Sequence, residues 1–160
     1  MKSLLLAALV LVSAHASAEG QIASLFSFES AASRPDADSG NTPSSNVTSI
    51  VNAGMEFTTP QNIAVHGGAS FIIGEEFESA INVGVRFYSS APAFQILPNA
   101  PIWSFIGGSV SFFDETVYYP EAGFRIGISN VSRLDVFVKL LTSDSDTYNN
   151  HVMVGAGLTF

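Results

Sequence analysis

The sequence predicts an all-β chain that folds as an eight-stranded antiparallel up-and-down transmembrane β-barrel, and three observations predict it. Apolar and polar residues alternate in segments of about 9–12 residues, which is typical of strands with one buried face. Hydrophobic residues make up 47% of the chain and charged residues 12%, whereas soluble domains carry about 25% charged residues. After residue 18 no run of 18 apolar residues occurs, so a closed barrel remains as the structure that crosses lipid with its backbone paired.

The first 18 residues, MKSLLLAALVLVSAHASA, are expected to be a cleaved secretory signal peptide. They contain one Lys, the apolar run Leu4–Val12 and small residues before the cleavage site. Residues 19–160 are then expected to form a single outer-membrane β-barrel domain, since an exported chain that crosses lipid with strands is typical of that membrane. Without Lys2 this domain has five basic and 14 acidic residues, a net charge of −9, which disfavours nucleic acid as a partner. The chain has no cysteine, so neither a disulfide nor a lipoprotein anchor is expected.

The first four strands are expected over residues 21–30, 47–58, 62–73 and 80–88. In each of them every second residue is apolar and is expected to face outward, as side chains alternate across a strand. The fourth alternates most cleanly, with Val83 and Val85 outward and Arg86 inward. Residues 31–46 and 74–79 read as exposed loops, and Thr59–Gln61 as a turn.

Residues 89–101 interrupt this pattern with three prolines, which exclude a regular central strand. Within them, Phe94–Leu97 is apolar and is expected to form an extra turn packed under the barrel.

The last four strands are expected over residues 102–113, 117–128, 132–141 and 151–160. The facing of the first of these is ambiguous, and its Gly107-Gly108 pair predicts a bend or bulge. In the last strand the face that starts at Val152 is apolar, and the face that starts at His151 contains glycines and polar residues. Ser129–Val131 is expected to be a tight turn.

Acidic residues are distributed unequally between the two ends of this barrel. Nine of the 14 acids fall in the four breaks on one side, and the three breaks on the other side contain none. An even number of strands places both termini in the periplasm, so the acidic breaks are expected to be extracellular. The nine acids are Asp36, Asp38, Glu75, Glu76, Glu78, Asp114, Glu115, Asp144 and Asp146.

The interior of an eight-stranded barrel is narrow enough for side chains to fill. If the turn after the sixth strand centres on Asn130, then Arg125 faces Asp135 and Glu121 faces Lys139. We therefore expect a structural network of paired charges that plugs the barrel, because an unpaired buried charge is costly. The network is predicted to comprise Glu56, Arg86, Glu121, Arg125, Asp135 and Lys139, and Glu29 and His66 are also expected to face inward.

Two histidines are candidate catalytic residues. His66 with Ser70, and with Glu56 or Asp135, has the residue types of a nucleophilic hydrolase, but no GxSxG-type motif accompanies them. His151 is expected near the extracellular rim, where a rim polar residue is the favoured interpretation. The sequence therefore predicts no catalytic residue.

No metal or other cofactor is expected either. Glu75, Glu76 and Glu78 are clustered but lack the spacing of a calcium-binding loop. A solvated loop face is the simpler interpretation, and a weak attraction for Mg²⁺ or Ca²⁺ bound to lipopolysaccharide phosphates is a hypothesis.

The end of the chain resembles the C-terminal assembly signal of bacterial outer-membrane barrels, with Phe160 last, Leu158 two residues before it and Gly155 five before it. The whole pattern is similar to small eight-stranded outer-membrane proteins of Gram-negative bacteria, such as the OmpA transmembrane domain, OmpX and YfaZ-like proteins. The resemblance implies a cell-outer-membrane location, contact with outer-membrane lipid and lipopolysaccharide, and recognition by the barrel-assembly machinery.

For this class we expect a non-enzymatic monomer with a structural, envelope-integrity or surface-interaction role. One alternative is an outer-leaflet lipid A-modifying hydrolase or acyltransferase. The His-x-Ser spacing of the lipid A deacylase family is absent, since Val152 and Met153 follow His151. A second alternative is a soluble secreted carrier similar to lipocalins.

Overall fold

The computed structural model describes residues 20–33, 47–73, 77–97, 100–129, 131–144 and 148–160. The expected signal peptide, residues 1–18, lies outside the described residues. So do residues 34–46, Glu75, Glu76 and Asp146, which belong to the expected acidic loops.

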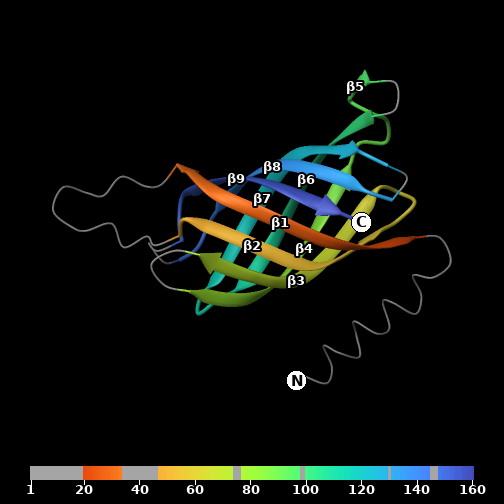
Figure 1. Ribbon diagram of the computed structural model, residues 1–160. Helices are drawn as coiled ribbons and strands as arrows, with labels where there is room; N and C mark the ends of the chain where they lie inside the picture. Colours follow the sequence, from red (N-terminus) through yellow and green to blue (C-terminus); the bar gives the residue numbers. More distant parts are fainter. Residues whose placement is uncertain (1–19, 34–46, 74–76, 98–99, 130, 145–147) are drawn as a thin grey trace.

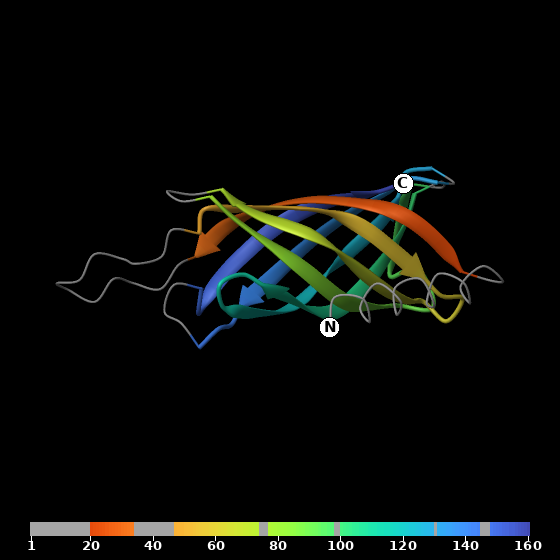
Figure 2. The same cartoon turned by 90° about the horizontal axis from the view of Figure 1, so that it is seen from below.

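Eight long antiparallel strands form a closed barrel (Figures 1 and 2). Each strand pairs with the next along the chain, and β1 pairs with β9 to close the wall. The predicted eight-stranded antiparallel barrel is thus confirmed. Among the described residues no helix is long and apolar enough to cross a membrane. The barrel strands are β1 Gln21–Ser33, β2 Ser49–Thr58, β3 Ile63–Ile73, β4 Glu78–Tyr88, β6 Ala100–Phe112, β7 Thr116–Gly127, β8 Arg133–Leu141 and β9 His151–Thr159.

The predicted register of the hairpin between β7 and β8 is also confirmed. Arg125 lies opposite Asp135, and Glu121 lies opposite Lys139. Inward side chains on these strands are buried, whereas their outward neighbours, such as Val136 at 46% exposure, are open. The alternation of apolar and polar residues therefore correctly predicts which side chains face the interior and which face outward.

Of the expected bend or bulge at Gly107-Gly108, the bulge is wrong. The pairings of β6 with β4 and with β7 run through both glycines without a register shift. Gly107 instead leaves room for a neighbour, since a Cβ there would lie 2.5 Å from the Val85 carbonyl oxygen and 3.1 Å from Arg86 Cγ. The same pairings settle the facing of β6, with Phe105 buried inside and Ile106 exposed outside.

The expected turn packed under the barrel is wrong as well. Phe94–Leu97 forms a short strand, β5, that pairs with the first residues of β6. β5 stands off the side of the wall, at the end where the C terminus lies (Figure 1). The register shifts between Gln95 and Leu97, beside Pro101, which agrees with the restriction of proline to edges and bulges.

Two layers fill the interior of the barrel. The layer at the end of the loops is apolar, and we call it the apolar layer; it comprises Val47, Ile50, Ile72, Ala80, Phe113, Val117, Tyr119, Leu141, Tyr148 and Met153. The layer in the middle and toward the opposite end is charged, and we call it the ionic layer; it comprises Glu29, Glu56, Arg86, Glu121, Arg125, Asp135 and Lys139. The expectation of a charged plug therefore describes one of the two layers.

Candidate functional site: the ionic layer and the outer wall

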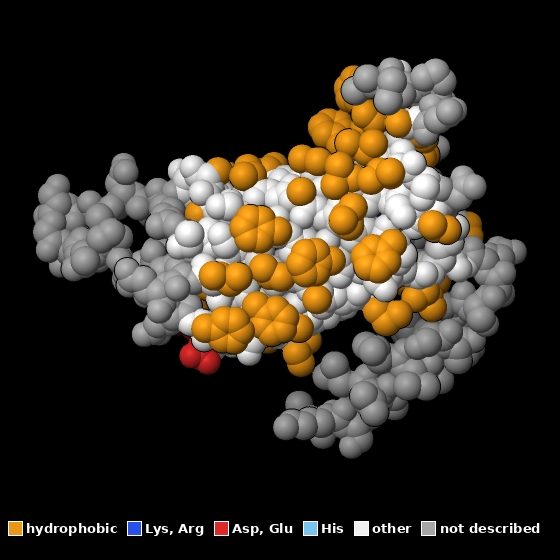
Figure 3. Space-filling view, viewed as in Figure 1, with side chains coloured by type: hydrophobic (Ala, Val, Ile, Leu, Met, Phe, Trp, Pro, Cys, Tyr) orange, Lys and Arg blue, Asp and Glu red, His pale blue; other side chains and the backbone are white. Residues whose placement is uncertain are grey.

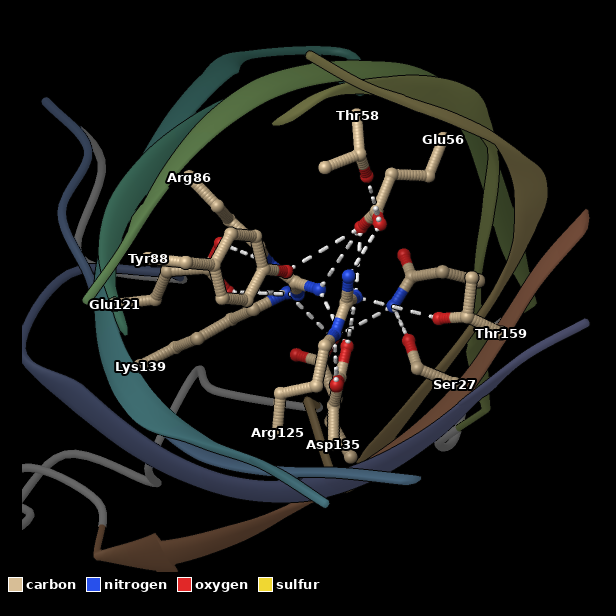
Figure 4. A network of polar contacts seen from close by, with 12 residues as sticks. Ser27, Glu56, Thr58, Arg86, Tyr88, Glu121, Arg125, Asp135, Lys139 and Thr159 are labelled. Atoms are coloured by element: carbon tan, nitrogen blue, oxygen red, sulfur yellow. Dashed lines mark hydrogen bonds and ion pairs between the residues drawn. The ribbon is translucent and has the colours of Figure 1, made fainter. Parts of the chain in front are cut away.

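Arg125 lies at the centre of the ionic layer (Figure 4). Its guanidinium donates to both carboxylate oxygens of Glu56, at 2.6 and 2.9 Å, and to both oxygens of Asp135, at 2.7 Å each. Its charged group also stacks on the Tyr88 ring, 4.4 Å from the centroid. Since charge-assisted bidentate pairs are among the strongest hydrogen bonds in proteins, Arg125 joins β2, β7 and β8 across the interior.

Arg86 is the second cation of this layer and is almost fully buried. Its Nε and Nη2 donate to the two carboxylate oxygens of Glu121, at 2.8 and 3.1 Å, and its Nη1 donates to Asp135 at 2.9 Å. The guanidinium lies over the rings of Phe105 and Phe137, at 4.8 and 5.5 Å from their centroids. Asp135 therefore bridges the two arginines.

Lys139 completes the layer through Glu29, a residue outside the predicted network. Its ammonium group donates to Glu29 at 2.7 Å, whereas its distance to Glu121 is 3.8 Å. Glu121 makes its shorter contacts with Arg86, so register neighbours are not the closest ion pair here. Gly155 lies between Glu29 and Phe137 in the sheet, and a Cβ there would approach Glu29 Cγ to 2.9 Å.

An uncharged polar chain extends this network toward β4. The Asn52 amide donates to Glu29 at 2.6 Å and to Ser27 at 3.0 Å. Ser70 donates to Asn52 at 2.5 Å, and Asn82 donates to Ser70 at 2.7 Å. Sequence reasoning missed these links, although all four residues lie on the inward face that the alternation predicts.

Among the described residues, no hydrogen bond joins His66 to Ser70. The Ser70 hydroxyl donates to Asn52, and His66 Nδ1 is buried without a hydrogen-bond partner among the described residues. His66 lines a cavity of about 20 Å³ together with Tyr119, Lys139 and other inward residues. This volume is close to the smallest that can hold one water molecule, so this cavity has no room for an organic substrate.

His151 lies at the loop end of β9, near the rim as expected, and its side chain is fully buried. Its Nδ1 lies 2.9 Å from the carbonyl oxygen of Asn149 and 3.2 Å from that of Tyr148. Because both neighbours are acceptors, Nδ1 carries a hydrogen in this arrangement. The imidazole therefore holds the end of the preceding loop in place.

Tyr148 belongs to the apolar layer and reaches it from that same loop. Its ring stacks on Phe113 with centroids 5.7 Å apart, and its hydroxyl donates to Glu78 at 2.5 Å. Burial, followed by the interactions with Glu78, raises the pKa of Tyr148 above its ordinary value. The neutral phenol is thus the form that closes this end of the barrel.

The proposed assembly-signal residues lie along the seam that closes the barrel. Leu158 and Phe160 face outward, at 44% and 61% exposure. Ser24 and Phe160 exchange two backbone hydrogen bonds, at 2.7 and 3.0 Å. A Cβ at Gly155 would lie 2.6 Å from the Phe137 ring inside. Their recognition by assembly machinery stays a prediction.

The outer wall differs from the interior in its charge. Among the eight barrel strands, all of them within the described residues, no outward-facing position carries a charged side chain. Large apolar side chains are open on this surface, including Met55 at 58%, Ile81 at 65% and Ile106 at 66% exposure. Figure 3 shows such side chains distributed over one face of the wall.

No protein-family model matches the sequence, and a comparison with curated proteins finds no match.

Proposed function

We propose that the protein is an integral outer-membrane barrel with a structural, envelope-integrity or surface-interaction role rather than an enzymatic one. The observation that carries the proposal is the uncharged wall around a charged interior. Contiguous exposed apolar patches larger than a few hundred Å² are rare on soluble monomers, whereas lipid stabilises such a surface. A barrel also meets the requirement that every backbone group be paired in lipid.

The filled interior supports a plugged barrel rather than a pore. Seven charged side chains, each nearly or fully buried, are held by one another at the centre, and the apolar layer closes the loop end. A water-filled channel needs a wider barrel, as in porins of about 16–18 strands. We therefore expect little or no ion conductance.

The same features disfavour the two alternatives. A lipocalin-like carrier encloses its apolar ligand within the barrel, whereas this interior is charged and its cavity is about 20 Å³. For a lipid A-modifying enzyme, His151 would have to reach substrate at the rim, but it is fully buried against backbone carbonyl groups. These contacts favour a structural role for His151.

The proposal includes an orientation and partners. The end with Glu78, Asp114, Glu115 and Asp144 would face the outside, next to lipopolysaccharide, and the end with the short turns would face the periplasm. The leader at residues 1–18 and the C-terminal Phe160 would direct export and recognition by the barrel-assembly machinery. A monomer is the simplest state for such a closed wall.

Membrane extraction tests this proposal most directly. The full chain, produced in a Gram-negative host, should sediment with outer membranes, resist carbonate extraction and migrate faster on gels when unheated. Recovery of the wild-type protein in the periplasm or medium would refute membrane insertion.

A charge on the wall sharpens this test. Val136→Arg places a charge on the outward face of β8 and should prevent stable insertion, because such a charge costs about 2–4 kcal/mol at mid-membrane. Thr142→Arg, at the exposed loop end of the same hairpin, is the matched control and should insert normally.

Two further measurements separate the alternatives. Purified protein in planar bilayers should give no steady conductance, and a stable open channel would contradict the plug. Mass spectra of lipid A should be unchanged on overexpression; a modification that disappears in His151→Ala would favour the enzyme instead.

A further inference from the structure

The segment between β4 and β6 differs in composition from every break at the opposite end of the barrel. The segment lies within a charge-free stretch of the chain that runs from Arg86 on β4 to Asp114. The 13 residues from Ser89 to Pro101 include three prolines and several apolar residues but no charge. A long uncharged segment at a turn that would face the periplasm calls for an explanation, because exposed connections are usually polar.

The outer side of this hairpin, which we define as the described residues 89–97 and 100–102 and call the β5 hairpin, is apolar at Phe94 and Ile102. Phe94 lies opposite Ile102 in the β5–β6 pairing, and its ring lies 5.9 Å from that of Phe124 on β7. Ile102 is buried, whereas Phe94 is 57% and Phe124 43% exposed. The apolar surface of the wall therefore continues from Phe124 onto Phe94 of the hairpin.

The direction of the β5 hairpin determines what this surface can touch. In Figure 1 it projects from the side of the barrel near the end that holds the C terminus, and in Figure 3 apolar side chains lead from the wall toward it. If the barrel axis lies along the membrane normal, a sideways projection runs parallel to the membrane plane. If the wall also spans the hydrocarbon, a projection at this end of the wall lies near the boundary between acyl chains and headgroups.

We propose that the β5 hairpin is a lipid-binding surface that lies in the periplasmic interface of the membrane, with Phe94 inserted among the acyl chains. Aromatic side chains favour this boundary, and amphipathic elements lie flat in it with their apolar side down. Ala91, Pro92 and Ala93, which are exposed beside Phe94, offer no charge that the boundary would repel. This inference rests on the proposed membrane location.

Fluorescence quenching by lipids brominated on their acyl chains tests the inference. Trp103 is the only tryptophan of the chain, so Trp103→Phe provides a background without tryptophan. In that background Phe94→Trp places the probe on the apolar side of β5, and Gln95→Trp places it on the opposite side of the same strand. Phe124→Trp is the reference on the wall. Each full-length variant is folded into vesicles with and without brominated phosphatidylcholine, and its circular dichroism is compared with that of the parent.

The expected result is strong quenching at position 94, similar to that at 124 and several-fold greater than that at 95. Strong quenching at 124 with little at 94 would overturn the lipid-binding hairpin while leaving the membrane barrel intact; a protein partner for the hairpin would give this pattern in pure lipid. Equal quenching at 94 and 95 would overturn the one-sided insertion. Absence of quenching at all three positions would refute the proposed membrane location itself.

Discussion

The two interior layers stabilise one barrel by different physical means. In the apolar layer, side chains such as Leu141 and Met153 are fully buried and need no particular partner, because hydrophobic burial is not directional. In the ionic layer each guanidinium donates to two carboxylates at 2.6–3.1 Å. These two carboxylates fix its orientation. The first layer tolerates a change of shape, whereas the second depends on every member.

The two layers also have different roles in the folded barrel. Buried charges are stable when their hydrogen bonds are complete and water does not compete for them. The apolar layer and Tyr148 cover the ionic layer from the loop end. We infer that the apolar layer excludes water and that the ionic layer fixes the relative positions of the strands.

The largest loss of stability is expected for Arg125→Met. This change leaves Glu56 and Asp135 without their central cation, and removing one member of a buried ion pair costs about 3–5 kcal/mol. Urea unfolding of the barrel folded in vesicles measures the effect. Arg133→Met removes an exposed contact with Gln21 and is the matched control, with an expected loss below about 1 kcal/mol. Equal losses in the two variants would mean that the ionic layer contributes nothing special.

Leu141→Ala probes the apolar layer and should cost about 2–4 kcal/mol, because it removes a fully buried side chain and leaves a cavity. Its neighbour Leu140 faces outward at 42% exposure, so Leu140→Ala should cost clearly less in the same unfolding assay. Bilayer recordings should remain silent for both variants. A new conductance in Leu141→Ala would show that the apolar layer alone seals the barrel.

Gly84→Ala tests how closely the ionic layer is packed around His66. A Cβ at Gly84 would lie 2.5 Å from both His66 Nε2 and Ser109 Cβ, and overpacking of this kind costs about 1–3 kcal/mol. Gly108→Ala is the control, because its Cβ would meet the Tyr119 carbonyl oxygen at an ordinary 3.6 Å. Thermal melts in detergent should separate the two, and an unchanged melt of Gly84→Ala would indicate a loosely packed interior.

Tyr148→Phe should have the smallest effect, about 0.5–1.5 kcal/mol, from loss of the hydrogen bond to Glu78. Because burial raises the pKa of Tyr148 above 10.0, the folded barrel holds the phenol proton more tightly than the unfolded chain. The contribution of Tyr148 is complete below pH 10 and is lost as the pH rises above it. Unfolding measured from pH 8 to 11 should show this loss in the wild-type protein and a smaller one in Tyr148→Phe.

The sequence was sufficient to predict the eight-stranded barrel, to predict which side chains face its interior, and to predict the register of β7 against β8. Alternation with period two has a direct structural meaning in a closed wall, so Val83 and Val85 could be placed outside and Arg86 inside. The register of β7 and β8 followed from one short turn and two opposite-charge pairs, Arg125–Asp135 and Glu121–Lys139. These are local properties, and local properties can be read along the chain.

Contacts across the interior could not be predicted in the same way. The pairs Arg125–Glu56 and Lys139–Glu29 join strands that are not neighbours in the sheet, and their meeting depends on the tilt and stagger of the closed barrel. The apolar layer could have been predicted from the doublets Ile72-Ile73 and Leu140-Leu141. Because successive residues of a strand face opposite sides, each doublet places one apolar side chain in the interior.

The β5 hairpin was missed for a different reason. The prolines at 92, 98 and 101 correctly exclude a central strand, but they permit a short strand with a partner on one side. The position of Phe94 on an exposed surface follows from that pairing with β6 and from the path of the chain beyond Tyr88, which the composition alone does not specify.

The seam between β1 and β9 has a consequence for how the chain acquires its structure. Lys139 and Glu29, which meet across this region, are 110 residues apart in the sequence. Bringing such distant segments together carries the full entropic cost of ring closure before any contact rewards it. We therefore expect hairpins to form early and the seam to join last, so that Arg125 and Asp135 meet early within the β7–β8 hairpin, whereas Lys139 and Glu29 meet only when the seam closes.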